Sequence, residues 1–277
     1  MRRSFVIASS LAFVLAVTAC GDDEREQEAT KPVTATFELS GSGKQKTLTG
    51  PESIEGGLVR IEFTNSTTDR AGVQLFRGIE GHSGAEAREA AARWAEKGKP
   101  LPGWVKIEGG TPWAAPAEAS SAVQELPAGD YMAVDFDSDA VTPLKVTGSH
   151  NGADPPTADA RIEATEYSFT ATGLEAGVNT VEFANTGKEP HFFAAVPLKP
   201  GATVAQVRKF LRTEEGESPL VEDEDAETIS AVLDGGRKQV IELDLMKGRY
   251  ALGCFIPDRA GGPPHAFKGM ISEAVVE

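Results

Sequence analysis

Four side chains that can bind a metal ion stand in the C-terminal half of this chain of 277 residues. Cys254, His265 and Met270 fall within one loop, CFIPDRAGGPPHAFKGM, and His191 ends the upstream segment NTGKEPH. One thiolate and two imidazoles form the trigonal plane of a copper electron-transfer site, with a methionine sulfur as its weak axial ligand. The chain has only four histidines and four methionines, so two histidines and one methionine at these positions favour a metal site.

Each of these residues also has an interpretation without metal. His191 could be a core or edge histidine bonded to backbone. His265, next to two prolines and an aromatic residue, could be a loop histidine. Taken alone, a methionine such as Met270 more often fills a core than binds an ion, and Cys254 could be a buried, inert thiol.

The other cysteine, Cys20, ends an N-terminal segment that is typical of export. Arg2 and Arg3 form a basic region, residues 5–17 form a short apolar stretch, and small residues precede the cysteine. This segment resembles the lipobox of bacterial lipoproteins, in which the cysteine becomes the lipidated first residue. We therefore expect acyl chains on Cys20 to be the only membrane anchor. The two arginines fit either an ordinary basic region or a twin-arginine export signal.

The charge of the chain restricts its partners. Removing residues 1–19 would delete two arginines and change the net charge from −15 to −17. Such an acidic surface argues against nucleic acid and against docking on anionic lipid by charge. We expect the protein on the extracytoplasmic side of the cell membrane, where lipidated Cys20 leaves Cys254 as a single thiol in an oxidising compartment.

The elements that must position these side chains form two repeats. GLVRIEFTN at 57–65 matches GVNTVEFAN at 177–185 at an offset of 120 residues. A capped, alanine-rich helix predicted at 83–97 matches residues 200–211 at an offset of 117. Residues 126–135 match residues 245–254 at 119, which aligns Tyr131 with Tyr250. Three matches at nearly one offset indicate two copies of one domain.

Short alternating strands, one helix per repeat and a Gly-rich closing hairpin predict an all-β fold of two Greek-key β-sandwiches. The segments that we expect, in chain order, are a signal peptide (1–19), a disordered tether (20–32), a first domain (33–147), a linker (148–160) and a second domain (161–277).

The second repeat resembles the cupredoxins, the plastocyanin-like blue-copper proteins. Their Asn…Pro-His segment corresponds to Asn185 and His191, and their Tyr-rich strand that runs into a cysteine corresponds to Tyr250 and Cys254. Their closing His and Gly-Met correspond to His265 and to residues 269–270. The resemblance covers residues 160–277 and implies a β-sandwich with one type 1 copper at one end.

One departure from the family leaves two alternatives open. Ten residues separate Cys254 from His265, where cupredoxins have only a few. This insertion either forms an ordered flap that returns His265 to the metal, or displaces His265 and leaves a copper-free relic. The first repeat is simpler: Ala71 and Asp135 stand where His191 and Cys254 would be, so we expect no type 1 copper there.

The sequence offers no support for an enzyme. It lacks a P-loop, a supported Ser-His-Asp arrangement and a His-Glu-x-x-His segment, and it has none of the His-x-His pairs that multicopper oxidases need. We expect a lipoprotein that binds one copper ion through His191, Cys254, His265 and Met270. Its function would be electron transfer or copper handling with a redox or copper-exchange protein. The alternative is a metal-free, cupredoxin-like binding module at the cell surface.

Overall fold

The computed structural model describes residues 31–277, apart from 44, 137, 149–150, 222 and 224–225. The expected signal peptide of residues 1–19, the lipidation site Cys20 and the tether up to residue 30 lie outside the described residues. Within the described part of the chain, no helix has both the length and the apolar character needed to cross a bilayer.

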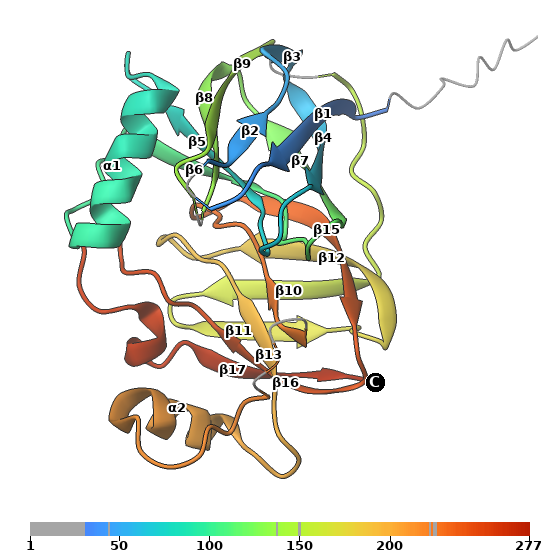
Figure 1. Cartoon of the computed structure of the whole chain (residues 1–277), viewed down its shortest axis with the longest axis vertical. Helices are drawn as coiled ribbons and strands as arrows, with labels where there is room; N and C mark the ends of the chain where they lie inside the picture. Colours follow the sequence, from blue (N-terminus) through green and yellow to red (C-terminus); the bar gives the residue numbers. More distant parts are fainter. Residues whose placement is uncertain (1–30, 44, 137, 149–150, 222, 224–225) are drawn as a thin grey trace, which may run out of the picture.

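Strands dominate both halves of the described chain (Figure 1). The elements of the first half are β1 (Val33–Ser40), β2 (Thr47–Thr49), β3 (Ser53–Glu55), β4 (Gly57–Asn65), β5 (Val73–Gly78), α1 (Gly84–Lys97), β6 (Val105–Gly110), β7 (Ala119–Leu126), β8 (Gly129–Asp135) and β9 (Val141–Thr147). Those of the second half are β10 (Ala160–Thr165), β11 (Ser168–Thr172), β12 (Gly177–Asn185), β13 (Ala194–Pro197), α2 (Val204–Thr213), β14 (Thr228–Ile229), β15 (Lys238–Leu245), β16 (Gly248–Gly253), the 3₁₀ helix η2 (His265–Lys268) and β17 (Ile271–Val276). The predicted all-β sandwich with one α-helix per repeat is confirmed.

The two repeats share a sheet, which the sequence did not predict. Eight strands follow one another in the order β11-β10-β12-β15-β7-β4-β1-β2. The junction is antiparallel pairing between β15 and β7, in which Ile241 lies opposite Ala122. A five-stranded sheet (β3-β9-β8-β5-β6) completes the first sandwich and a four-stranded sheet (β14-β13-β16-β17) the second. The domain boundaries stay a prediction, because one sheet runs through both halves.

Matching side chains occupy matching places in the two repeats. Ser83 and Thr203 both cap their helices through a capping box, at an offset of 120 rather than the 117 taken from the sequence. The Tyr131 hydroxyl donates to the Pro127 carbonyl at 2.6 Å, and the Tyr250 hydroxyl donates to the Met246 carbonyl at 3.0 Å. Each tyrosine thus ties its strand to the carbonyl four residues upstream.

Three apolar clusters hold these layers together. One fills the first sandwich around Phe37 and Phe63, and another fills the second around Phe183 and Phe193. A third cluster, around Trp94 of α1, includes Val232 and contacts Phe192 and Ile256 of the second repeat. This third cluster buries apolar surface between the repeats, next to the segments that carry the predicted ligands.

Candidate metal centre

His191 is fixed by the turn that follows β12. Its backbone pairs with Leu233, donating at 2.9 Å and accepting at 2.8 Å. The Asn185 amide spans the turn by donating to the carbonyls of Glu189 and Leu233. The Asn…Pro-His segment thus acts as a hydrogen-bonded brace, and it leaves the His191 imidazole fully buried.

The first repeat has the same brace without the histidine. The Asn65 amide donates to the carbonyls of Asp69 and Ala114, and Ala71 pairs with Ala114 as His191 pairs with Leu233. Asp135 takes the place of Cys254, since it lies opposite Val73 at the end of β8. An alanine and a carboxylate cannot supply the copper ligands that the second repeat offers. At this position the first repeat therefore offers Ala71 and Asp135 in place of the histidine and the cysteine.

Cys254 follows β16 and is held from both sides. The Cys254 amide lies 3.4 Å from the Met270 carbonyl, and the Cys254 carbonyl accepts from Ala266 at 2.7 Å. The Met270 amide in turn donates to the His265 carbonyl at 3.0 Å. These bonds fold η2 back over the strand end, so Cys254, His265 and Met270 become neighbours.

The long loop of residues 255–264 returns His265 to the cysteine. Nδ1 of His265 lies 3.4 Å from Sγ of Cys254 and 3.1 Å from Nδ1 of His191. One ligand atom from each of the three residues lies within 4.8 Å of the other two. Of the two alternatives that the sequence left open, the structure has the ordered flap.

Met270, the predicted axial ligand, lies in the same apolar cluster as Cys254. All four predicted ligands have 0% of their surface exposed. The ligand role of Met270 stays a prediction, since it follows from the place of Met270 in the sequence and from its burial.

Burial sets the protonation of the metal-free group. It raises the pKa of the Cys254 thiol to about 12. Burial, together with the neighbouring His265, lowers the pKa of His191 to about 4. Burial also lowers the pKa of His265, although Asp258 opposes that shift. At neutral pH the group therefore holds a neutral thiol and two neutral imidazoles, and metal binding must displace the thiol proton.

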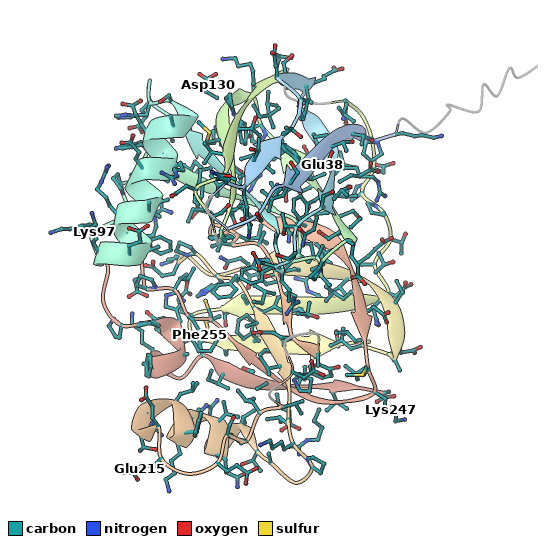
Figure 2. All side chains as sticks on the ribbon, in the orientation of Figure 1. Glu38, Lys97, Asp130, Glu215, Lys247 and Phe255 are labelled. Atoms are coloured by element: carbon teal, nitrogen blue, oxygen red, sulfur yellow. The ribbon has the colours of Figure 1, made fainter. Side chains whose placement is uncertain are left out.

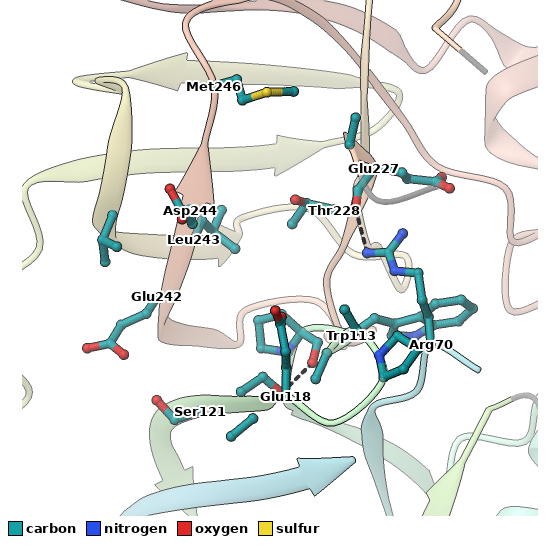
Figure 3. A pocket seen from close by; sticks show the side chains of 18 of the residues that line it. Arg70, Trp113, Glu118, Ser121, Glu227, Thr228, Glu242, Leu243, Asp244 and Met246 are labelled. Carbon is teal, nitrogen blue, oxygen red and sulfur yellow. Dashed lines mark hydrogen bonds between the residues drawn. The ribbon is translucent and has the colours of Figure 1, made fainter. Parts of the chain in front are cut away.

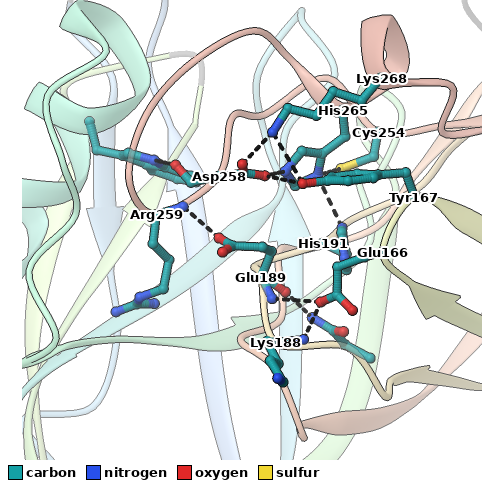
Figure 4. Close-up of polar contacts among 12 residues, drawn as sticks. Glu166, Tyr167, Lys188, Glu189, His191, Cys254, Asp258, Arg259, His265 and Lys268 are labelled. Atoms are coloured by element: carbon teal, nitrogen blue, oxygen red, sulfur yellow. Dashed lines mark hydrogen bonds and ion pairs between the residues drawn. The ribbon is translucent and has the colours of Figure 1, made fainter.

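A polar network that the sequence reasoning missed surrounds His265 (Figure 4). Nε2 of His265 lies 3.0 Å from the Asp258 carboxylate. The Tyr167 hydroxyl donates to the same carboxylate at 2.9 Å, and Lys268 forms an ion pair with it. Burial raises the pKa of Asp258, but these two donors outweigh it and leave the pKa below its usual range. Asp258 is the only carboxylate of the long loop, and this was the one feature of the sequence that could have predicted the network.

The donor set fits copper. Bonds of about 2.0–2.1 Å, as in zinc–histidine bonds, would place two imidazole nitrogens roughly 3.3–3.6 Å apart around one ion. The two Nδ1 atoms, at 3.1 Å, are close to that separation. One thiol and two imidazoles, with the Met270 thioether in the same apolar cluster as the thiol, form a soft set that suits copper, whereas structural zinc takes four strong donors.

The other histidine among the described residues takes no part in this group. His82 stacks on Trp104 with ring centroids 3.8 Å apart and lies 3.6 Å from the Glu86 carboxylate. His150 lies outside the described residues.

A hollow of about 820 Å³ lies elsewhere, between the repeats near β7 and β15 (Figure 3). Its lining includes Trp113, Glu118, Glu242, Asp244 and Met246, and none of the four predicted ligands. The hollow is therefore separate from the buried Cys-His-His group.

No family model matches the chain, and no curated protein matches it. Solved structures do. Auracyanin A, a "blue" copper protein from Chloroflexus aurantiacus, is 20% identical over 42% of this chain and 100% of its own, with a TM-score of 0.31. The reduced auracyanin of Roseiflexus castenholzii is 19% identical over 42% of this chain and 94% of its own, with a TM-score of 0.28.

A copper nitrite reductase from Nitrosomonas europaea spans both repeats. It is 12% identical over 89% of this chain and 94% of its own, with a TM-score of 0.24. At such identities and TM-scores, the assignment of the site rests on its geometry. That geometry, a β-sandwich with a buried Cys-His-His group and a methionine in the same apolar cluster as the cysteine, fits a single type 1 copper.

Proposed function

We propose that this protein carries single electrons through one copper ion bound in its second repeat. The observation that carries the proposal is a fully buried cluster in which Nδ1 of His265 lies 3.4 Å from Sγ of Cys254 and 3.1 Å from Nδ1 of His191. Cys254, His191 and His265 would hold the ion, and Met270 would be a further, weak ligand. Copper in such a site supplies reversible one-electron chemistry.

The protein's part is to fix these donors. His191 is held by the Asn185 brace, His265 by Asp258, and Cys254 by backbone bonds on both sides. Donors that are fixed before the metal binds move little when the charge of the site changes, which favours rapid electron exchange. Complete burial excludes water from the ligands and favours retention of the ion over its delivery to another protein.

The same burial supports a carrier rather than an enzyme. A catalytic metal keeps a position open for substrate or water. In this group, all ligand side chains are covered by protein. We therefore propose a redox protein as the partner, and no small-molecule substrate.

The proposed location is the extracytoplasmic face of the cell membrane, with Cys20 lipidated and residues 20–32 as a tether. The support is the N-terminal sequence and the acidic charge of the chain. Labelling with a radioactive fatty acid in a bacterial host tests it. Label that is present in the wild type and absent from Cys20→Ser supports the anchor, and label in neither contradicts it.

Copper titration of residues 21–277 tests the function. We expect one ion per chain and reversible reduction by one electron. His191→Gln should lose both, and His82→Gln, which changes a histidine outside the group, should keep both. A chain that binds no stoichiometric copper would instead be the metal-free binding module.

A further inference from the structure

We propose that the first repeat, which lacks copper ligands, serves as a rigid support that holds the long loop and thereby positions His265. This inference rests on the proposed copper site for its purpose. Its structural part concerns the contacts that the first repeat makes with the long loop and with the segment beside His191. It gives the degenerate repeat a function that its own residues do not otherwise suggest.

The first contact connects α1 to the histidine in two steps. Nε1 of Trp94 donates to the backbone carbonyl of Asp258 at 2.7 Å. The carboxylate of the same Asp258 lies 3.0 Å from Nε2 of His265. Trp94 is 3% exposed and lies in the apolar cluster between the repeats, so its indole is held rigidly. The position of α1 therefore fixes Asp258, and Asp258 orients the imidazole.

Arg259 makes the second contact. Its carbonyl accepts from the Leu101 amide at 2.6 Å, and its guanidinium donates to the carbonyls of Pro102 at 3.1 Å and Val105 at 2.6 Å. The guanidinium also pairs with Asp234 at 2.5 Å. The Arg259 side chain thus bonds to two backbone carbonyls of the first repeat and to one carboxylate of the second repeat.

The third contact is between backbones. A Cβ atom on Gly261 would come within 2.7 Å of the carbonyl oxygen of Gly98, the residue that ends α1. Gly261 also has a φ of +88°, which side-chain-bearing residues rarely adopt. Figure 2 labels Lys97, in the last turn of α1, and Phe255, at the start of the loop. The end of α1 and the tip of the loop therefore pack without an intervening side chain.

The first repeat also holds the segment beside His191. The Gln74 amide donates to the Val232 carbonyl at 3.2 Å, and its oxygen accepts from the Val232 amide at 2.8 Å. The Asp234 backbone and carboxylate both bond to Ile107, at 3.0 and 2.9 Å. Since Leu233 pairs with His191, both copper-binding imidazoles are placed by segments that rest on the first repeat.

A loop with ten residues between Cys254 and His265 needs such a support. A longer flexible loop has more conformations to lose when it closes on a metal. Contacts with a rigid neighbour remove those conformations before the ion arrives, which favours tight and slow-dissociating binding. Loss of one hydrogen bond between the first repeat and the long loop should raise the equilibrium constant for loop opening by about two- to tenfold.

Trp94→Phe removes the indole donor and keeps an aromatic ring in the cluster. Trp113→Phe is the matched control, because Nε1 of Trp113 has no hydrogen-bond partner among the described residues and Trp113 lines the hollow of Figure 3, whose lining includes no residue of the long loop. The primary readout is amide hydrogen exchange of residues 256–266 in the metal-free protein. We expect about two- to tenfold faster exchange in Trp94→Phe and no change in Trp113→Phe. Equal exchange in both variants would overturn the proposal.

The copper-loaded protein gives the second readout. Copper should dissociate several-fold faster from Trp94→Phe, and the spectrum of its Cu(II) site should shift, while Trp113→Phe matches the wild type. If neither the wild type nor any variant binds copper, the proposed function fails. The exchange result still decides whether the first repeat supports the loop. Should Trp94→Phe fail to fold, Arg259→Gln is the second variant, with Arg93→Gln, an exposed side chain of α1 that pairs with Glu89, as its control.

Discussion

Nδ1 of His265 lies 3.4 Å from Sγ of Cys254, although ten residues separate the two side chains in sequence. This closeness results from two features that act together. The backbone of η2 bonds to the Cys254 carbonyl, and the long loop rests on the first repeat through Trp94 and Arg259. The first repeat thus holds the ten-residue insertion in a conformation that keeps His265 beside Cys254.

Copper affinity should rise with pH. Burial raises the pKa of the Cys254 thiol to about 12, so below that pH copper must displace one proton to bind the thiolate. His191, with its pKa lowered to about 4, is already neutral near pH 6 and adds no further proton there. The dissociation constant should fall about tenfold per pH unit between about pH 6 and pH 8. Competition with a chelator of known affinity measures this, and a dissociation constant independent of pH would contradict it.

Asp258→Asn should raise the reduction potential of the bound copper. The carboxylate lies 3.0 Å from Nε2 of His265, and its negative charge stabilises the more positive oxidised site. Its neutral replacement should shift the potential upward by roughly 20–60 mV. Asp139→Asn changes an exposed carboxylate on the first repeat and is the control. Voltammetry of both variants decides; equal potentials would show that Asp258 does not tune the site.

The two corner tyrosines should contribute similarly to stability. Tyr131→Phe and Tyr250→Phe each remove a hydroxyl that donates to a carbonyl four residues upstream. Each variant should lower the free energy of unfolding by about 0.5–1.5 kcal/mol. Urea denaturation of the metal-free protein measures this. A change in neither variant would mean that these bonds do not stabilise the repeats.

The two repeats should unfold together. β7 and β15 join them in one sheet, and the cluster around Trp94 buries side chains of both. Calorimetry of the metal-free protein should therefore show one cooperative transition. Two well-separated transitions, each with half of the enthalpy, would mean that the repeats are independent domains.

The sequence predicted those parts of the site that depend on local patterns. Comparison of the repeats aligned Ala71 with His191 and Asp135 with Cys254, because strand register carries over between copies of one fold. It missed Asp258 and Trp94, since their roles depend on where the long loop meets the other repeat. The sequence also did not predict the pairing of β15 with β7, because an alternating pattern indicates a strand but not which strand lies next to it in the sheet.

The absorption spectrum of residues 21–277 after addition of Cu(II), with copper quantified in parallel, shows directly whether Cys254 binds a type 1 copper. A short bond between copper and a thiolate gives an intense visible band. We expect that band at one copper per chain, its loss in Cys254→Ser, and its retention in Met246→Leu, which alters an exposed methionine outside the site. A chain without the band, or a band that survives in Cys254→Ser, would contradict a type 1 copper site at Cys254.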